Sequence, residues 1–368
     1  MELLYCGFNG FGQLSSVRTG IVSCLTPFPA EGIQLASLSW SYVALKSDRG
    51  IQLSGFVGHR SHQVKCVGMH DSVAISCNRK HMLAVVETGV CWRYCIESGS
   101  WRRLDPFTTV EQDIEGERED DSVVQVCSGA TFDASVSESG RAFIMPSPIY
   151  NPGTKVTQVA CGNEHCLLVT EIGEVFSWGI GSRGQLGHSD LENEDETARQ
   201  VDVLAGLRVT RVAAGGWHSA AVTDSGDLYT WGWNNSGQLG FPTCAEEQQQ
   251  CDKSETCSTE AVSILNFPLP VNWDKTIMNV GCGSRHTVVL LDDGSVWGCG
   301  WNAFGQLGTS PKTMQSCWKM HKLELPSKCV AQDVLCGAWS TMVFTIPDQE
   351  DKEPFAGRSL KRKHEEAD

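Results

Sequence analysis

A string of three residues, Gly-Gln-Leu, occurs four times in this chain of 368 residues. The second and third copies, centred on Gln185 and Gln238, are 53 residues apart, and the fourth follows 68 residues later at Gln306. The first copy stands near the N-terminus, at Gln13. Self-similarity at a period of about fifty residues is typical of a repeat architecture, in which each unit packs on its neighbours. Repeat proteins commonly serve as binding surfaces, so a catalytic site would need separate support.

The clearest repeat unit runs from Val212 to Gly240. Two short runs rich in apolar and aromatic residues flank the turn Asp224-Ser225-Gly226-Asp227, where glycine supplies a positive φ angle without steric cost. Short apolar runs around a glycine turn predict an antiparallel β-hairpin. Similar units begin at Val159 and Val280. Fainter copies are Leu38-Ser39-Trp40, Val67-Gly68-Met69-His70 and Val126-Cys127-Ser128-Gly129.

The two ends of the chain carry complementary halves of one unit. Residues 334–346 hold only a first half, and residues 2–14 hold only a second half with its Gly-Gln-Leu loop. A closed ring explains this split, because an N-terminal strand paired into the last unit hides sheet edges that an open array would expose. We therefore predict an all-β, seven-bladed β-propeller over residues 1–346, closed by the N-terminal strand and interrupted by acidic insertions. Residues 347–368 are expected to form a disordered polar tail.

The Trp-Gly segments with their Gly-Gln-Leu-Gly loops, and the strands that begin Gly-x-x-His, resemble those of the regulator-of-chromosome-condensation family of seven-bladed propellers. The resemblance covers roughly residues 1–346. Kelch repeats have a similar period but need a recurrent Gly-Gly doublet, which occurs here only at Gly215-Gly216. The resemblance therefore implies the same fold that the split unit predicts.

Three His and four Gln residues recur at matched places in the units. Repetition of this kind predicts a structural role, such as a bond to a neighbouring loop or turn. Radial symmetry places the His residues in separate blades, too far apart to share one metal ion. We therefore expect no catalytic residue, no metal site and no cofactor. The repeated residues are His165, His218, His286, Gln13, Gln185, Gln238 and Gln306.

Cysteine is frequent, with 17 residues, and several of them share one repeat position. Cys161, Cys282 and Cys336 fall on strands predicted to be buried, where a free thiol acts as a small hydrophobic group. The odd count and the lack of a Cys-x-x-Cys pair argue against a disulfide framework or a structural zinc site, and favour a reducing compartment. The N-terminus lacks the basic region of a signal peptide, and no apolar run approaches membrane-spanning length.

The net charge of −15 disfavours binding to a phosphate backbone and favours a basic partner, such as a histone tail. Insertions at residues 104–122, 189–196 and 243–259 interrupt the repeat, and we expect them to be exposed. The units before residue 148 have lost most of the repeated residues, either by drift or because a partner binds there. We expect partner binding in this N-terminal half, with the first insertion attracting a basic surface. The candidate residues are Glu111, Asp113, Glu115, Glu117, Glu119, Asp120 and Asp121.

The family resemblance, with a single propeller and the short basic cluster Lys361-Arg362-Lys363, implies a non-enzymatic, chromatin-associated adaptor in the nucleus. By the same resemblance its partner is a Jumonji-C histone demethylase, with histones as a second partner, in histone methylation control and chromosome segregation. The alternative is guanine-nucleotide exchange on a Ran-like GTPase, the activity of the family's founding member. A regulatory role for a ubiquitin ligase is a third reading, although the chain contains no ligase domain. We expect a monomer that binds neither membranes nor nucleic acid directly.

Overall fold

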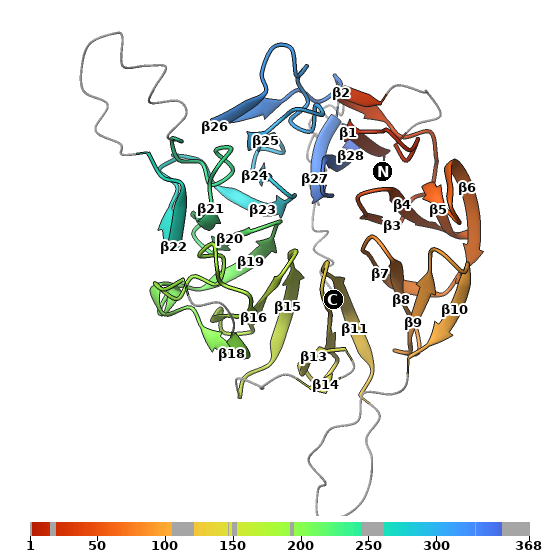
Figure 1. Cartoon of the computed structure of the whole chain (residues 1–368), viewed down its shortest axis with the longest axis horizontal. Coiled ribbons are helices and arrows are strands. Elements are labelled where there is room, and N and C mark those ends of the chain that lie inside the picture. The colour runs from red at the N-terminus through yellow and green to blue at the C-terminus, as the bar shows by residue number, and fades with distance from the viewer. Residues whose placement is uncertain are drawn as a thin grey trace, which may run out of the picture.

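The computed structural model of the chain describes residues 2–14, 20–104, 121–145, 147–148, 153–191, 195–243, 261–327 and 329–347. This part of the chain consists of 28 β-strands and one turn of 3-10 helix, η1 (Asp202–Leu204). The strands form seven four-stranded antiparallel sheets, arranged as blades around a central axis (Figure 1). The all-β, seven-bladed propeller predicted from the repeats is therefore confirmed. None of the described residues forms a helix with the length and apolar character needed to cross a membrane.

The blades follow the chain in order, and the first strand of blades 1 to 6 lies nearest the axis. Blade 1 contains β3 (Leu35–Leu38), β4 (Tyr42–Ser47), β5 (Gly50–Val57) and β6 (Arg60–Gly68). Blade 2 contains β7 (Ser72–Cys77), β8 (His81–Val86), β9 (Cys91–Cys95) and β10 (Ser100–Arg103). Blade 3 contains β11 (Val123–Ser128), β12 (Asp133–Ser137), β13 (Ala142–Ile144) and β14 (Ser147–Pro148).

The following three blades contain the best-preserved repeats. Blade 4 contains β15 (Val156–Cys161), β16 (His165–Thr170), β17 (Val175–Gly179) and β18 (Asp195–Gln200). Blade 5 contains β19 (Val209–Ala214), β20 (His218–Thr223), β21 (Leu228–Trp233) and β22 (Ile264–Pro270). Blade 6 contains β23 (Ile277–Cys282), β24 (His286–Leu291), β25 (Val296–Trp301) and β26 (Ser316–Leu323).

Blade 7 is assembled from both ends of the chain. Its inner strands are β27 (Cys329–Cys336) and β28 (Ser340–Pro347), and its outer strands are β1 (Glu2–Phe8) and β2 (Ile21–Pro27). β1 pairs with β28 in continuous antiparallel register from Glu2 opposite Thr345 to Gly7 opposite Ser340. This pairing confirms that the N-terminal strand closes the ring, and β2 adds a second strand to that closure.

The hydrophobic core is divided among the seams, which we define as the contacts between neighbouring blades. Seven clusters of buried apolar side chains fill these seams, one cluster to each pair of neighbours. Seven seams for seven blades require a closed ring, since an open array has one seam fewer than its blades. Each blade is therefore stabilised from both sides, as expected when repeats cannot bury their faces alone.

Consecutive antiparallel strands alternate in direction, so the turns fall on two faces. The upper face is the one that carries the Gly-Gln-Leu loops and, in each blade, the turn between the first and second strands. The lower face carries the turn between the second and third strands of each blade and the connections from one blade to the next.

The structure corrects one faint repeat. Val67 and Gly68 end β6, the outermost strand of blade 1, and His70 lies in the connection that follows. The first strand of blade 2 is β7, where Cys77 pairs with Met82 as Cys161 pairs with Cys166 in blade 4. β6 extends over nine residues, and its apolar end resembles the start of a new unit.

Candidate protein-binding surface

The repeated His residues join neighbouring blades through a hydroxyl group. His165 begins β16 of blade 4, and its Nε2 lies 2.9 Å from the Oγ of Ser219 on β20 of blade 5. The same hydroxyl donates to the backbone oxygen of Gln185, at 2.8 Å, in the Gly-Gln-Leu loop of blade 4. One hydroxyl of blade 5 therefore binds both a strand and a loop of blade 4.

This relay of His, hydroxyl and Gln carbonyl recurs at the next two seams. His218 Nε2 lies 3.0 Å from the Oγ1 of Thr287, which donates to the backbone oxygen of Gln238 at 2.6 Å. All of the relay residues are fully buried. At the seam between blades 6 and 7 the members are His286, Thr341 and Gln306, with distances of 3.2 and 2.7 Å.

The relay sets the protonation of the His rings. Each hydroxyl donates its proton to a carbonyl, so it accepts a hydrogen bond from the ring Nε2–H. Burial lowers the pKa of His165 and His218 to about 3 and that of His286 to about 4, so the rings are neutral at pH 7. The three rings lie in separate blades. Across the described ranges, no group of His, Cys, Asp or Glu residues is placed to hold a metal ion.

The repeated Gln side chains hold their own loops. In each loop the Gln Oε1 accepts a hydrogen bond from the backbone N–H two residues earlier, as from Arg183 to Gln185 at 2.9 Å. The same bond forms at Gln13, Gln238 and Gln306. Gln13 Nε2 also donates to the backbone oxygen of Trp40, at 3.4 Å. The other three Nε2 atoms are buried without a partner in the described part of the chain, so only one end of those amides holds the loop.

The upper loops place a continuous series of aromatic and arginine side chains on one face, which we call the aromatic belt. The Arg183 guanidinium lies over the rings of Trp217 and Trp233, with its Cζ at 4.3 and 5.1 Å from their centroids. The Arg285 guanidinium lies over Trp233 and Trp301, at 4.7 and 5.8 Å. Two arginines and three tryptophans from blades 4 to 6 therefore alternate along this part of the belt.

The belt continues across the closing blade to blades 1 and 2. Trp301 contacts Trp339 with their ring centroids 4.8 Å apart, and Phe8 contacts Phe304 at 5.0 Å. At the far end, the Arg79 guanidinium lies 4.9 Å from the Trp40 ring centroid. The belt comprises Trp40, Trp217, Trp233, Trp301, Trp339, Phe8, Phe11, Phe56, Phe304, Arg79, Arg183 and Arg285.

The belt surrounds the upper mouth of an axial cavity of about 770 Å³, lined by the first strands of all seven blades. Trp40, Arg79 and Trp339 belong to both features. Backbone bonds between glycine-rich turns narrow this mouth. The bonds run from Asn163 N to Gly215 O at 3.2 Å, from Gly216 N to Gly283 O at 3.0 Å and from Ser284 N to Ala338 O at 2.9 Å.

The thiols along the axial cavity are protonated. Burial raises the pKa of Cys77 and Cys282 to about 12, and it raises that of Cys161 and Cys336 well above the ordinary value. A protonated thiol is a poor nucleophile and a poor metal ligand. Cys77, Cys161, Cys282 and Cys336 take part in no disulfide. The equivalent cysteines therefore serve as small apolar side chains along the axis, with Cys77 buried and the other three half-buried.

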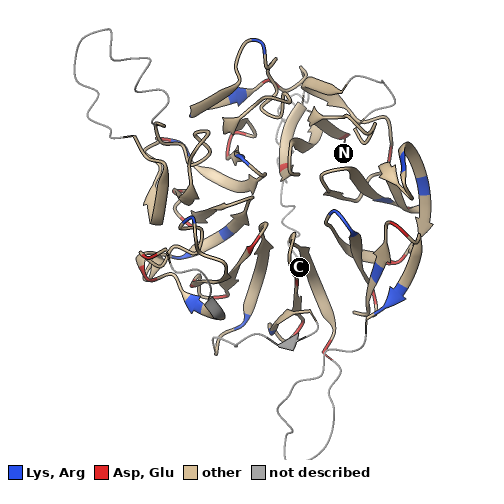
Figure 2. Ribbon diagram, viewed as in Figure 1, with Lys and Arg blue, Asp and Glu red and all other residues tan. Residues whose placement is uncertain are grey.

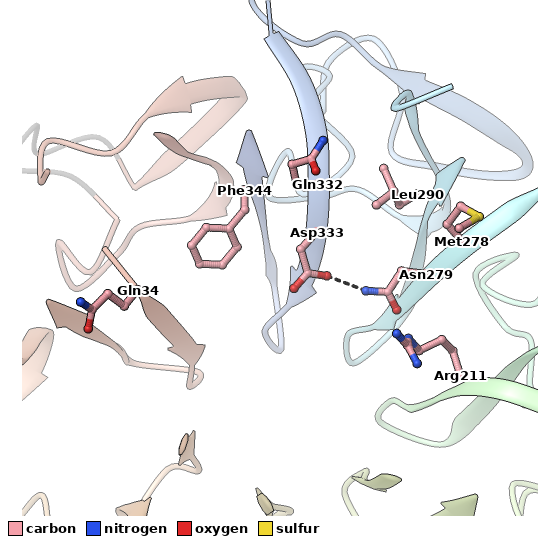
Figure 3. A pocket seen from close by; sticks show the side chains of 8 residues that line it. All are labelled: Gln34, Arg211, Met278, Asn279, Leu290, Gln332, Asp333 and Phe344. Atoms are coloured by element: carbon pink, nitrogen blue, oxygen red, sulfur yellow. Dashed lines mark hydrogen bonds between the residues drawn. The ribbon is translucent and has the colours of Figure 1, made fainter. Parts of the chain in front are cut away.

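A second, smaller pocket of about 560 Å³ opens on the lower face and is shown in Figure 3. In blade 4, the Gln158 amide exchanges two bonds with the Val212 backbone of the next blade, at 3.0 and 3.1 Å. Arg211 takes the same strand position in blade 5 and has no acceptor to offer. At the next seam, between blades 6 and 7, Asn279 Nδ2 donates a hydrogen bond to Asp333 Oδ1 at 2.5 Å. The pocket forms where this series of amide bridges is interrupted.

The acidic candidate residues fall mostly outside the described part of the chain. Glu111, Asp113, Glu115, Glu117, Glu119 and Asp120 lie outside it. Asp121 is described, and its Oδ1 accepts a hydrogen bond from Ser139 N at 3.3 Å, while its Oδ2 accepts one from Ser139 Oγ. These bonds attach Asp121 to the turn between β12 and β13 on the lower face.

The sequence reading missed an ionic relay between blades 2 and 3. His81 occupies the repeated His position, and its Nε2 lies 2.7 Å from Asp133 Oδ2. Asp133 takes the place of the hydroxyl residue and also binds Arg93 Nη2, at 2.9 Å. The signal was present in Cys77-Asn78-Arg79-Lys80-His81, which follows the pattern Cys-Gly-x-x-His with Asn78 in place of glycine.

The belt was also missed, although it follows three repeat positions. Arg183 and Phe304 directly precede the glycine of a Gly-Gln-Leu loop, and Arg285 ends a turn between first and second strands. The third position is the aromatic residue after the last glycine of a third strand, as in Gly232-Trp233. A comparison of the units at these positions would have found it.

The comparisons with known proteins agree with this geometry. Two models of the regulator of chromosome condensation (RCC1) repeat match the chain, one over residues 173–222, 225–290 and 293–344 and the other over residues 156–185, 209–238 and 279–306. The solved structure of Prp20p from Saccharomyces cerevisiae has a TM-score of 0.75, over 95% of this chain and 92% of that chain. Its sequence identity is 15%, so this likeness shows the fold alone.

Two curated relatives extend the match to the altered N-terminal blades. RCC1 domain-containing protein 1 is 31% identical in Mus musculus and 32% identical in Homo sapiens. Each alignment covers 92% of this chain and 96% of the relative. Because the likeness extends over nearly the whole length of both relatives, the chain belongs to the regulator of chromosome condensation family.

Proposed function

We propose that this chain is a non-enzymatic adaptor, which binds a nuclear protein on chromatin through its upper face. The observation that carries this proposal is the aromatic belt, a half-exposed series of Trp, Phe and Arg side chains shared by six of the seven blades. Tryptophan and arginine are the residues most enriched where protein interfaces derive their binding energy. A contiguous apolar patch on a soluble protein is typical of an interaction site.

Family membership supports a place on chromatin. The crystal structure of Prp20p was described together with its binding to Gsp1p and histones. We propose the nucleus and chromosomes as the location of this chain. By family resemblance, we propose a Jumonji-C histone demethylase as the protein that docks on the belt.

Histones are the second proposed partner, and they would approach the opposite face. The turns between second and third strands carry exposed carboxylates in each of blades 1 to 6. Opposite charge speeds the encounter with a basic partner. Asp121, the described end of the acidic candidate segment, adds a further carboxylate on this face. The exposed turn residues are Asp48, Glu87, Glu138, Glu171, Asp224, Asp227, Asp292 and Asp293.

The belt is tested by capture from nuclear extract followed by mass spectrometry. Trp233→Ala should lose the proteins that the unchanged chain retains, because Trp233 contacts both Arg183 and Arg285. Ile172→Ala is a matched control, since Ile172 is 53% exposed on the lower face, away from the belt. Equal capture by both variants, at equal melting temperature, would refute the belt as the docking surface.

The acidic insertion is tested with histone peptides. Neutralising Glu111–Asp121 to the corresponding amides should slow association and flatten its dependence on salt, because charges within a Debye length of about 10 Å at 0.1 M salt steer the encounter. An unchanged association rate would remove these residues from the partner site.

The alternative function is nucleotide exchange on a Ran-like GTPase, which the likeness of fold to Prp20p makes worth testing. A catalytic amount of the chain is added to Ran loaded with a fluorescent nucleotide. We expect release at the uncatalysed rate. Release accelerated in proportion to the amount of chain would establish exchange activity and overturn the adaptor assignment.

A further inference from the structure

We infer that the aromatic belt recognises an acidic peptide segment, with Arg183 and Arg285 each receiving a carboxylate on either side of Trp233. This inference rests on the proposed function of the upper face as a docking surface and names the chemistry of the partner. Three features carry it: the position of the arginines over tryptophan rings, the lack of acceptors for them in the described part of the chain, and the net charge of the protein.

Each guanidinium lies close to two tryptophan rings. Arg183 lies over the rings of Trp217 and Trp233, and Arg285 lies over those of Trp233 and Trp301. The Trp217 and Trp233 rings are nearly perpendicular, at 84°, so the Arg183 guanidinium is held by two rings of different orientation. These contacts restrict the positions of both guanidinium groups before a partner arrives. Such pre-organisation reduces the entropy lost on binding.

These arginines find no acceptor in the described part of the chain. Arg79, Arg183 and Arg285 form no ion pair there, and the Nε of Arg285 is buried without a hydrogen-bond partner. The nearby Glu164 carboxylate accepts from Trp217 Nε1 at 2.9 Å. Arg183 and Arg285 are half-buried, so the N–H donors at the outer edge of each guanidinium are the ones that an incoming acceptor can reach.

Two arginines elsewhere in the chain bind carboxylates. Arg93 binds Asp133 at 2.9 Å, and Arg199 binds Asp190 at 3.3 Å. The chain has 44 acidic residues against 29 Lys and Arg, and the two signs are interspersed around the ring (Figure 2). Among the described arginines, only Arg79, Arg183 and Arg285 lie over an aromatic ring, and this position distinguishes them from the other unpaired arginines.

A carboxylate is the acceptor that suits this place. Its two oxygens match the planar fork of a guanidinium in a bidentate pair. A long polyphosphate backbone carries a charge at every unit, so a protein with net charge −15 would repel it more strongly than a segment with two carboxylates. A second copy of the chain carries the same net charge of −15, which opposes its approach. The half-buried side chain of Trp233 between the two arginines fits an apolar residue between the two acids of the segment.

The test uses fluorescence anisotropy with a labelled synthetic peptide, Ser-Glu-Leu-Glu-Ser, and its counterpart with Gln in place of both Glu. The unchanged chain should bind the acidic peptide at least tenfold more tightly than the amide peptide. The double variant R183Q and R285Q should lose that tenfold preference. Arg211→Gln is a matched control, because Arg211 is exposed in the lower pocket and lies outside the belt.

Three outcomes would overturn the inference. The first is equal binding of the two peptides, and the second is an unchanged preference in the double variant at an unchanged melting temperature. The third is tighter binding of a phosphoserine peptide, which would assign the arginines to phosphate instead. If the acidic peptide fails while Trp233→Ala still loses its proteins from nuclear extract, the docking surface stands and only its acidic specificity falls.

Discussion

Blades 4 to 7 and blades 1 to 3 are joined to their neighbours by different chemistry. At the seams from blade 4 to blade 7, a neutral His ring, a hydroxyl and a loop carbonyl repeat without change. From blade 1 to blade 3, the Ser37 and Ser76 hydroxyls accept from the next first strand instead, at 2.9 Å from Cys77 N and 2.8 Å from Ser128 N. Only the seam between blades 2 and 3 adds charge.

Two further seams lack both the neutral and the ionic relay, and they show that the fold tolerates different contents at its seams. At the seam between blades 3 and 4, Phe132 takes the His position and Cys166 takes the hydroxyl position, and Phe132 stacks on Trp178 with 6.2 Å between ring centroids. The seam between blades 7 and 1 pairs Ser340 with Val43 in the same places. A seam therefore holds with either polar or apolar contents.

The largest expected effect comes from opening the ring. Deleting residues 1–14 removes β1 together with five buried apolar side chains, Leu3, Leu4, Tyr5, Cys6 and Leu14. At about 2 kcal/mol for each, the loss is on the order of 10 kcal/mol, which equals the whole stability of a typical domain. Circular dichroism and size-exclusion chromatography should show an unfolded or aggregated protein. A variant lacking residues 351–368 is the control, and a truncation that melts like the full chain would contradict closure by β1.

The next effect tests the ionic seam between blades 2 and 3. Asp133→Ala leaves His81 and Arg93 without their shared carboxylate, and we expect a loss of about 3 kcal/mol in urea unfolding. Ser135→Ala is a control two residues away on the same strand, because the buried Ser135 Oγ has no partner among the described residues and its removal should be nearly neutral. Equal effects of the two changes would show that the ionic contacts do not stabilise this seam.

The neutral relay should make blades 4 to 7 sensitive to acid. A buried His with a lowered pKa contributes stability that is complete above pH 6.5 and is lost as the pH falls toward the folded pKa of about 3 for His218. His218→Gln should therefore reduce the slope of unfolding free energy against pH by about 1.4 kcal/mol per unit between pH 6 and 4. Tyr42→Phe, which removes a 2.8 Å bond to the His81 backbone oxygen, should lower stability without changing that slope. An unchanged slope in His218→Gln would mean that the ring is charged in the folded state.

The smallest expected effect compares two tryptophans at one repeat position. Trp231 Nε1 donates to the Gln185 backbone oxygen at 2.9 Å, whereas Trp178 Nε1 has no partner in the described part of the chain. Blade 3 has no Gly-Gln-Leu loop to offer that carbonyl. Both changes to Phe reduce the side-chain volume alike, so Trp231→Phe should cost about 1 kcal/mol more than Trp178→Phe. Equal losses of stability in the two variants would show that the bond from Trp231 Nε1 to the Gln185 carbonyl contributes no more to stability than the hydrogen bonds that the indole N–H makes with water in the unfolded chain.

The ring could be read from the sequence because its signals are local. Each Gly-Gln-Leu loop and each glycine turn lies within a few residues, and two half units at the ends of a chain have one simple explanation. The His81 unit was read incorrectly because Asn78 replaces the glycine before it, while the end of β6 imitates a first strand.

The belt and the ionic seam depend on partners that only the closed ring brings together. His81 and Asp133 are 52 residues apart, and the change from hydroxyl to carboxylate at the second position hides its equivalence to Ser219. The belt joins residues from six blades through contacts between side chains, and no single unit contains enough of it to suggest a surface.

The glycine turns at the upper mouth have a consequence for how such a ring can change. A Cβ atom added to Gly162, Gly215 or Gly283 would overlap the carbonyl oxygen of the next turn, so the inner circumference has no slack. Adding an eighth blade would pull these turns apart, and removing one blade, to leave six, would press them together. Length can therefore be added only at the outer strands and connections, as it was at residues 104–122, 189–196 and 243–259. The glycine turns around the axis therefore keep the number of blades constant, while the outer strands and connections are free to diversify.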